Sequence, residues 1–141
     1  MSQNELRQKI VAFFKTYEYS NLITIDASGM PRGRMMDNLP LDDDLACWFG
    51  TGAQSPKVKE IHANPKVSVF LYRPEDHSSI CFQGEAMVVT DEGVRKEKWK
   101  EKWAVYWPDG PTNKDFAVIK ILPRKVTYLD WPSRKQEVMD L

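Results

Sequence analysis

Apolar residues at helical spacing open the chain and predict its first element. They repeat every three or four positions, as on one face of an amphipathic helix: Leu6, Ile10, Phe13, Phe14 and Tyr17. We expect this helix to span residues 3–17. A second, short helix is predicted after Ser55, because serine is a favoured N-cap and Pro56 suits the first helical position. Asn64 followed by Pro65 should end it.

Most of the remaining chain is β-branched, aromatic or alternating in polarity, which is typical of strands. Strands are predicted over these segments: 20–26, 32–40, 45–50, 66–73, 78–90, 116–123 and 125–131. The first two should form a hairpin around the Gly/Pro turn at 27–31, and the long fifth strand should bend at Gly84. The first three strands are joined by turns too short for crossover helices, so the sheet should be antiparallel.

The last third of the chain is more mixed. Residues 91–104 predict a third helix with a highly charged face, followed by a loop at 106–115 that holds two prolines and a glycine. Residues 132–141 are expected to be a polar tail. No repeat or linker divides the chain, so we expect one domain, residues 1–141, with residues 1–17 as its helical N-terminal part. Six or seven short strands with two to three helices favour a closed or partly closed β-barrel.

Composition excludes several partners by default. Twenty basic residues balance twenty acidic ones, so no net charge attracts nucleic acid or an anionic membrane. No apolar run approaches the roughly 20 residues needed to span a bilayer, and the N-terminus lacks the pattern of a signal peptide. Cys47 and Cys81 lie in apolar, strand-like segments and are expected to be reduced thiols. A cytoplasmic protein is therefore expected.

Local signatures of metal binding and nucleophilic catalysis are missing. The spacing of His62, His77 and the two cysteines matches no paired Cys/His zinc pattern, so no metal site is expected. No serine lies in a Gly-x-Ser-x-Gly motif, and neither cysteine has a histidine beside it in sequence. The catalytic residues, if any, are unknown from the sequence.

One segment, "FGTGAQSPK" at 49–57, has the composition of an anion site. It places Thr51, Ser55 and Lys57 where a strand gives way to a helix, whose N-terminus carries unpaired N–H groups and partial positive charge. Arg34, on an earlier strand, could add a bidentate fork. The segment is not a P-loop, because it lacks Gly-Lys-Ser/Thr. A phosphate site and an ordinary capped helix both remain open on these residues.

Several segments together resemble a known family. "ITIDASGMPRGRMM" followed by "ACWFGTGAQSPKVKEIHANPKVSVFLY" is similar to the pyridoxamine 5'-phosphate oxidase-like, FMN-binding split-barrel family. "FQGEAMVVTD", "WAVYWPDGP" and "VIKILPRKVTYLDW" resemble its general stress protein branch. The resemblance implies a six-stranded antiparallel split β-barrel with flanking helices. It also implies a homodimer with FMN at the subunit interface.

The resemblance also implies roles for individual residues. Arg34, Thr51, Ser55 and Lys57 match positions that hold the FMN phosphate. Other matches fall around the flavin ring: Met35, Trp48, Phe49, Gly50, Gln83, Gly84 and Trp107. The strand end at 48–50 would contact the ring through its backbone, and Trp107 would approach the cofactor across the dimer interface.

The implied function is that of an FMN-dependent oxidoreductase acting on an unidentified small molecule, with NADH or NADPH as a possible electron donor. The alternative is a non-catalytic protein of the same fold that stores or senses a flavin or a haem. Pyridoxamine phosphate oxidases themselves have a longer, basic C-terminal segment, whereas this sequence ends in "WPSRKQEVMDL". The resemblance therefore does not imply oxidation of vitamin B6.

Overall fold

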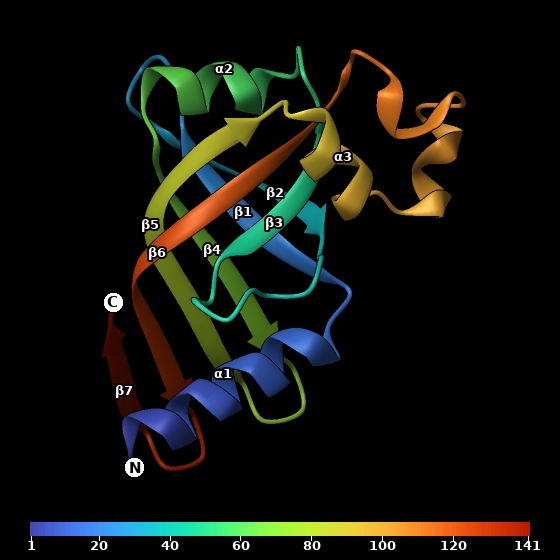
Figure 1. Cartoon of the computed structure of the whole chain (residues 1–141). Helices are drawn as coiled ribbons and strands as arrows, with labels where there is room; N and C mark the ends of the chain where they lie inside the picture. The colour runs from blue at the N-terminus through green and yellow to red at the C-terminus, as the bar shows by residue number, and fades with distance from the viewer.

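The fold is built on one antiparallel sheet that curls into a barrel (Figure 1). A computed structural model describes all residues, 1–141. The strands are β1 (Tyr19–Ile25), β2 (Pro31–Asp37), β3 (Cys47–Gly52), β4 (Lys66–Arg73), β5 (Ser78–Val89), β6 (Phe116–Asp130) and β7 (Lys135–Asp140). Their order is β2-β1-β4-β5-β6-β3, with β7 added to the edge of β6. β2 and β3 touch but do not pair, which leaves the barrel split. The predicted mainly β, antiparallel split barrel is confirmed, with seven strands rather than six.

Short helices surround this barrel. They are α1 (Gln3–Thr16), α2 (Pro56–Ala63) and α3 (Glu92–Lys98), with two 3₁₀ turns, η1 (Glu101–Val105) and η2 (Gly110–Thr112). α1 lies across one end of the barrel and α2 across the other, while α3 and the 3₁₀ turns extend to one side (Figure 1). None of the helices combines the length and apolar character that crossing a membrane requires.

The barrel interior is filled by alternate residues of the strands. On β4, for example, Val67, Val69 and Leu71 are buried. They join a cluster of 21 buried residues that also includes the apolar face of α1. Phe14 of α1, for example, packs edge-on against Phe82 of β5 at 5.7 Å between ring centroids. α1 is therefore held mainly by its apolar face.

Three predictions about the second half of the chain were wrong. The two strands expected at 116–123 and 125–131 are one strand, β6, which continues through Pro123. The proline is tolerated because β5 and β6 shift register there, with Gln83 opposite Lys125 and Gly84 opposite Pro123. In this bulge Arg124 has no partner on β5. Because the ladder is already interrupted there, the missing N–H of Pro123 costs little. The expected bend at Gly84 therefore exists, but both strands run through it.

The polar tail predicted at 132–141 is also ordered. Most of it forms β7, which pairs with β6 from Lys125–Asp140 to Asp130–Lys135. Met139 is buried in the main core and anchors this strand. The single inward apolar residue in a polar segment is a weak signal, which explains the error.

The helix predicted over 91–104 is interrupted. α3 ends at Lys98, and both Trp99 and Lys100 are extended before η1 begins. Trp99 packs against Phe116 at 5.1 Å, and Lys100 binds Asp37 at 2.9 Å. A continuous helix would not satisfy both contacts, so tertiary packing overrides the local helical preference.

We predict that Gly84→Ala destabilises the protein. A Cβ atom there would lie 2.0 Å from the carbonyl oxygen of Leu122, and neither strand can move without breaking the bulge. We expect a loss of about 1–3 kcal/mol in the free energy of unfolding, measured by urea denaturation.

Gly93→Ala is the matched control, because Gly93 lies within α3 and its Cβ would approach only the flexible side chain of Asp91. Its stability should be unchanged or slightly higher. Equal stability of the two variants would contradict a close backbone approach at Gly84.

Candidate functional site

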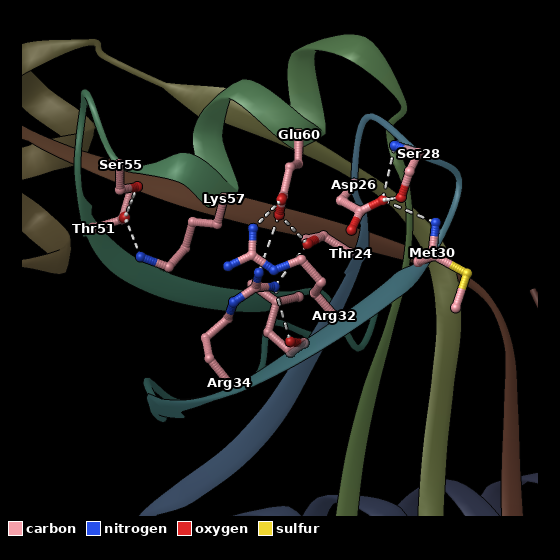
Figure 2. Close-up of polar contacts among 11 residues, drawn as sticks. Thr24, Asp26, Ser28, Met30, Arg32, Arg34, Thr51, Ser55, Lys57 and Glu60 are labelled. Atoms are coloured by element: carbon pink, nitrogen blue, oxygen red, sulfur yellow. Dashed lines mark hydrogen bonds and ion pairs between the residues drawn. The ribbon is translucent and has the colours of Figure 1, made fainter.

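Three of the residues expected at the anion site converge where α2 begins. Ser55 occupies the N-cap, but its hydroxyl makes no capping hydrogen bond. It lies instead 3.1 Å from Thr51 Oγ1, to which Lys57 Nζ donates at 3.2 Å (Figure 2). Pro56 has no N–H, and Val58 and Lys59 donate to the Ser55 carbonyl. Because the Ser55 side chain does not cap the helix, the backbone N–H of Lys57 is left for another acceptor.

Arg34 approaches this group from β2 with one edge of its guanidinium free. Its Nη1 donates to the Leu22 carbonyl at 3.1 Å and to Thr24 Oγ1 at 2.7 Å, and its Nη2 donates to Glu60 Oε1 at 3.1 Å. Three of its five N–H groups are thereby fixed by the protein. The remaining two, on Nε and Nη2, suit a bidentate contact with a phosphate or carboxylate.

Glu60 is the carboxylate that orients both arginines of β2. It is buried beneath α2 and accepts from Arg34, from Arg32 at 2.7 Å and from the Thr24 hydroxyl at 2.7 Å. The hydrogen bond from Thr24, together with those from Arg32 and its charge, lowers the pKa of Glu60. Figure 2 shows the two guanidinium groups gathered beneath Glu60, with Lys57 on the side away from Thr24.

The site carries an excess of positive charge. Burial, reinforced by repulsion from Arg34, lowers the pKa of Lys57. Arg32 and Arg34 share the single carboxylate of Glu60, and Lys57 makes no ion pair. An anion bound between Lys57 and Arg34 would relieve this repulsion.

A cleft of about 460 Å³ extends from this cationic group toward the aromatic segment after α3. Thr51 and Lys57 line it, together with Trp103, Tyr106 and Trp107. The carboxylates of Asp37 and Asp115 also line it, but each has partners within the chain. A cleft with both cationic and aromatic lining suits a planar ligand that carries an anionic group.

Asp37 fixes the aromatic segment to the barrel. Its carboxylate accepts from Lys100 at 2.9 Å and from the Trp103 indole N–H at 2.9 Å, and it pairs with Lys102 at 2.9 Å. Burial alone would raise the pKa of Asp37, but the hydrogen bonds from Lys100, Lys102 and Trp103 outweigh it and lower the pKa. The segment is therefore tied to β2 by an ionised carboxylate.

Gly50 allows this segment to pack closely on β3. A Cβ atom at Gly50 would lie 2.6 Å from the ring of Trp103. Trp103 also packs on Phe116, as does Trp107 at 5.0 Å between ring centroids. Trp107 donates to Asp115 at 3.3 Å, so the aromatic wall is held by both packing and hydrogen bonds.

The remaining predicted residues are distributed differently. Met35 lines the cleft and is 64% exposed. The side chains of Trp48 and Phe49 are buried away from the cleft, Trp48 donating to Asp42 at 2.8 Å. A backbone role at 48–49 remains a prediction.

Gln83 and Gly84 line a separate cavity beside the β5–β6 bulge. A single copy of the chain thus brings together five predicted residues around the cleft, with Ser55 and Arg34 adjoining: Met35, Gly50, Thr51, Lys57 and Trp107.

The sequence analysis missed several residues of this region. Glu60 lies three residues after Lys57 on α2, a spacing that places both on neighbouring parts of one helix surface. Thr24 follows Leu22 on the inward face of β1, and both are buried. Asp37 gave no sequence signal, because its partners come from residues 100–103. No three His, Cys, Asp or Glu side chains converge as a metal site would require.

The fold and site define a class: an antiparallel split barrel with a cationic helix start beside an aromatic cleft. The family model described as "Pyridoxamine 5'-phosphate oxidase like" matches residues 5–140. The chain therefore belongs to the pyridoxamine 5'-phosphate oxidase-like family, and the resemblance of its sequence is confirmed. A sequence search of curated proteins found no significant match.

Solved structures agree with this assignment. General Stress Protein 26 from Bacillus anthracis superposes with a TM-score of 0.82 and 26% identity, over 97% of this chain and 99% of that one. A pyridoxamine 5'-phosphate oxidase-related, FMN binding protein from Nostoc punctiforme has a TM-score of 0.70 and 15% identity, covering 100% and 99%. A heme binding protein from Mycobacterium smegmatis has a TM-score of 0.72 and 12% identity, covering 91% of this chain and 55% of its own. The last two likenesses show the fold alone.

We predict that Glu60 stabilises the protein in a pH-dependent way. Its pKa in the folded state is lower than in the unfolded chain, so its contribution is complete above about pH 4.3 and is lost as pH falls through the folded value. Glu60→Gln should lower the free energy of unfolding by roughly 1.5–3 kcal/mol at pH 7, measured by urea denaturation. The difference from wild type should shrink below pH 4.

Glu97→Gln provides the control, since Glu97 is exposed and makes no ion pair. A pH-independent difference between wild type and Glu60→Gln would show that the carboxylate charge is not what stabilises this network.

Proposed function

We propose that the protein binds FMN, with the phosphate at the start of α2 and the flavin ring toward the aromatic end of the cleft. The observation that carries this proposal is the free guanidinium edge of Arg34 together with Lys57, which has no carboxylate partner. Both cations lie beside the hydroxyls of Thr51 and Ser55. This donor set fits a dianionic phosphate monoester.

The flavin would supply the redox chemistry, transferring a hydride or electrons between a donor such as NADH or NADPH and a small molecule. The chain would contribute the phosphate anchor, the orientation of the ring and an apolar wall that includes Met35 and Trp107. The FMN binding protein from Nostoc punctiforme supports this assignment at the level of the fold.

Haem is the second ligand suggested by the fold, since one similar structure is of a heme binding protein. Neither histidine nor cysteine lines the cleft of this chain. The axial ligands of globins and P450 proteins are therefore missing from it, although Met and Tyr, the types used by cytochromes c and catalase, line it. We favour flavin because Lys57 and the free edge of Arg34 fit the phosphate of FMN, a group that haem lacks.

We further propose that two copies of the chain associate through the outer face of the sheet. Cross-strand pairing places one row of residues side by side over six strands: Met35, Asn21, Phe70, Cys81, Thr127 and Val138. The row contains no charged residue, although 28% of the chain is charged, and Phe70 and Val138 are each 37% exposed. Depletion of charge on an exposed apolar face is typical of the centre of a protein interface.

This outer face continues into the cleft. Met35 belongs to the row and also lines the cleft, so a second copy seated on the row would lie beside the proposed flavin site. Gln83, on the same face of β5, would be covered by that copy. A homodimer therefore offers a way for Gln83 and Gly84 to approach a cofactor that they do not face within one chain.

We predict that Lys57→Ala and Arg34→Ala each weaken the binding of FMN more than the binding of riboflavin. Riboflavin lacks the phosphate, so only FMN should lose a charge-assisted contact, by about 1.5–3 kcal/mol or about ten- to hundredfold in affinity. Fluorescence titration of both ligands measures the difference. Lys59→Ala is the matched control, because Lys59 lies on the same helix but not in the cleft.

Equal losses for both ligands would place the two cations at the wrong end of the cofactor. A purified protein that is colourless and does not change flavin fluorescence would overturn FMN binding itself. Flavin that binds but is not reduced by NADH or NADPH would favour storage or sensing over catalysis with these donors.

We predict that Phe70→Glu yields a monomer with weakened FMN binding, because it places a charge at the centre of the uncharged row. Light scattering coupled to size-exclusion chromatography measures the mass. Met87→Glu is the control. Met87 is exposed and apolar, as Phe70 is, but it lies on β5 beyond the bulge and outside the row. A Phe70→Glu protein that remains dimeric would show that the interface lies elsewhere.

A further inference from the structure

A second cavity, unrelated to the proposed flavin cleft, lies between α1 and residues 38–41. Its volume is about 510 Å³, within the range of small-molecule sites. α1 contributes Val11 and Phe14, and the facing segment contributes Leu39, Pro40 and Leu41. Val11 is 38% exposed although it is apolar. The cavity therefore presents apolar surface to solvent that an amphipathic ligand could cover.

The charges around this cavity have one sign. Lys15 and Lys100 line it, and no carboxylate does. Lys15, in the last turn of α1, makes no ion pair, whereas Lys100 is held by Asp37 and by the Asn38 carbonyl at 2.7 Å. Lys15 is thus the cation left available to a ligand.

The polar wall has spare hydrogen-bonding capacity. Asn38 is buried, and its Oδ1 accepts from the Ser20 hydroxyl at 2.6 Å while its Nδ2 donates to the Tyr17 carbonyl at 3.0 Å. One N–H and one lone pair of this amide have no partner within the chain. A ligand carboxylate could bind Lys15, which places the anionic end of the ligand near the last turn of α1.

We propose that this cavity binds a small apolar carboxylate, with its alkyl or aryl part against Val11, Pro40 and Leu41 and its carboxylate at Lys15. Apolar walls alone would bind a neutral molecule as well as an anion. The positive charge of Lys15 supplies the preference for an anion. The site is independent of FMN, although Asn38 is adjacent to Asp37, which lines the cleft. A ligand in the cavity would therefore contact the segment that separates the cavity from the cleft.

The test uses octanoate, hexanoate and 1-octanol, titrated by calorimetry into the full-length protein without flavin. Octanoate should bind on the order of tenfold more tightly than hexanoate, because two more methylene groups are buried. 1-Octanol should bind more weakly than octanoate. Amide NMR shifts on adding octanoate should be largest at Val11, Lys15 and Asn38.

Two variants separate the parts of the site. Val11→Asp places a negative charge in the wall and should weaken octanoate at least tenfold. Lys15→Gln should weaken octanoate about two- to fivefold and leave 1-octanol unchanged. Lys9→Gln, on an exposed position of the same helix outside the cavity, should change neither.

Several results would overturn the proposal. These are the absence of octanoate binding at millimolar concentration, equal affinity for octanoate and 1-octanol, and NMR shifts centred away from α1. Full octanoate affinity in folded Val11→Asp would also overturn it. Because the protein is tested without flavin, none of these results bears on FMN binding.

Discussion

The site depends on the hydrogen bonds and ion pairs of one buried carboxylate, that of Glu60. It joins α2 to the β1–β2 hairpin by accepting from Thr24, Arg32 and Arg34. A buried carboxylate of this kind is stable only when its lone pairs are occupied by cationic or polar donors. The same contacts fix the Arg34 guanidinium and leave one edge of it free. A structural ion pair and a candidate ligand-binding group are thus parts of one network.

The placement of Glu60 also determines the charge of the site. One carboxylate shared by Arg32 and Arg34 leaves an excess of positive charge beside Lys57, whose pKa is lowered by burial and by Arg34. An unliganded cluster of cations is electrostatically unfavourable, and a bound anion would relieve it. The cations gather where a helix N-terminus and two hydroxyls converge, an arrangement that suits the proposed phosphate site.

A second carboxylate, Asp37, organises the other end of the cleft. Its contacts with Lys100, Lys102 and Trp103 hold the aromatic segment against β3, where Gly50 leaves room for the Trp103 ring. The two carboxylates have different roles: Glu60 positions the cationic group and Asp37 positions the aromatic wall. The family's fold provides the barrel, and these two networks give this chain the chemical character of its cleft.

Local sequence patterns determined much of this protein. The apolar spacing of α1, the alternation on β4, the Ser-Pro start of α2 and the family's motifs predicted a mainly β, antiparallel split barrel, which is confirmed. These features depend on neighbours in sequence, so one sequence suffices to find them. The convergence of Thr51, Ser55 and Lys57 followed from the same local reasoning, although their role with a phosphate remains a prediction.

Tertiary structure decided the rest, because the contacts concerned join residues that are far apart in the chain. Pro123 lies within one continuous strand only because β6 bulges at Arg124, opposite Gln83 and Gly84. Trp99 and Lys100 interrupt a helical pattern because Phe116 and Asp37 hold them in extended conformations. Residues 135–140 form a strand because β6 offers an edge and the core accepts Met139. The orientation of Arg34 likewise required a carboxylate 26 residues away, which no local pattern on β2 could reveal.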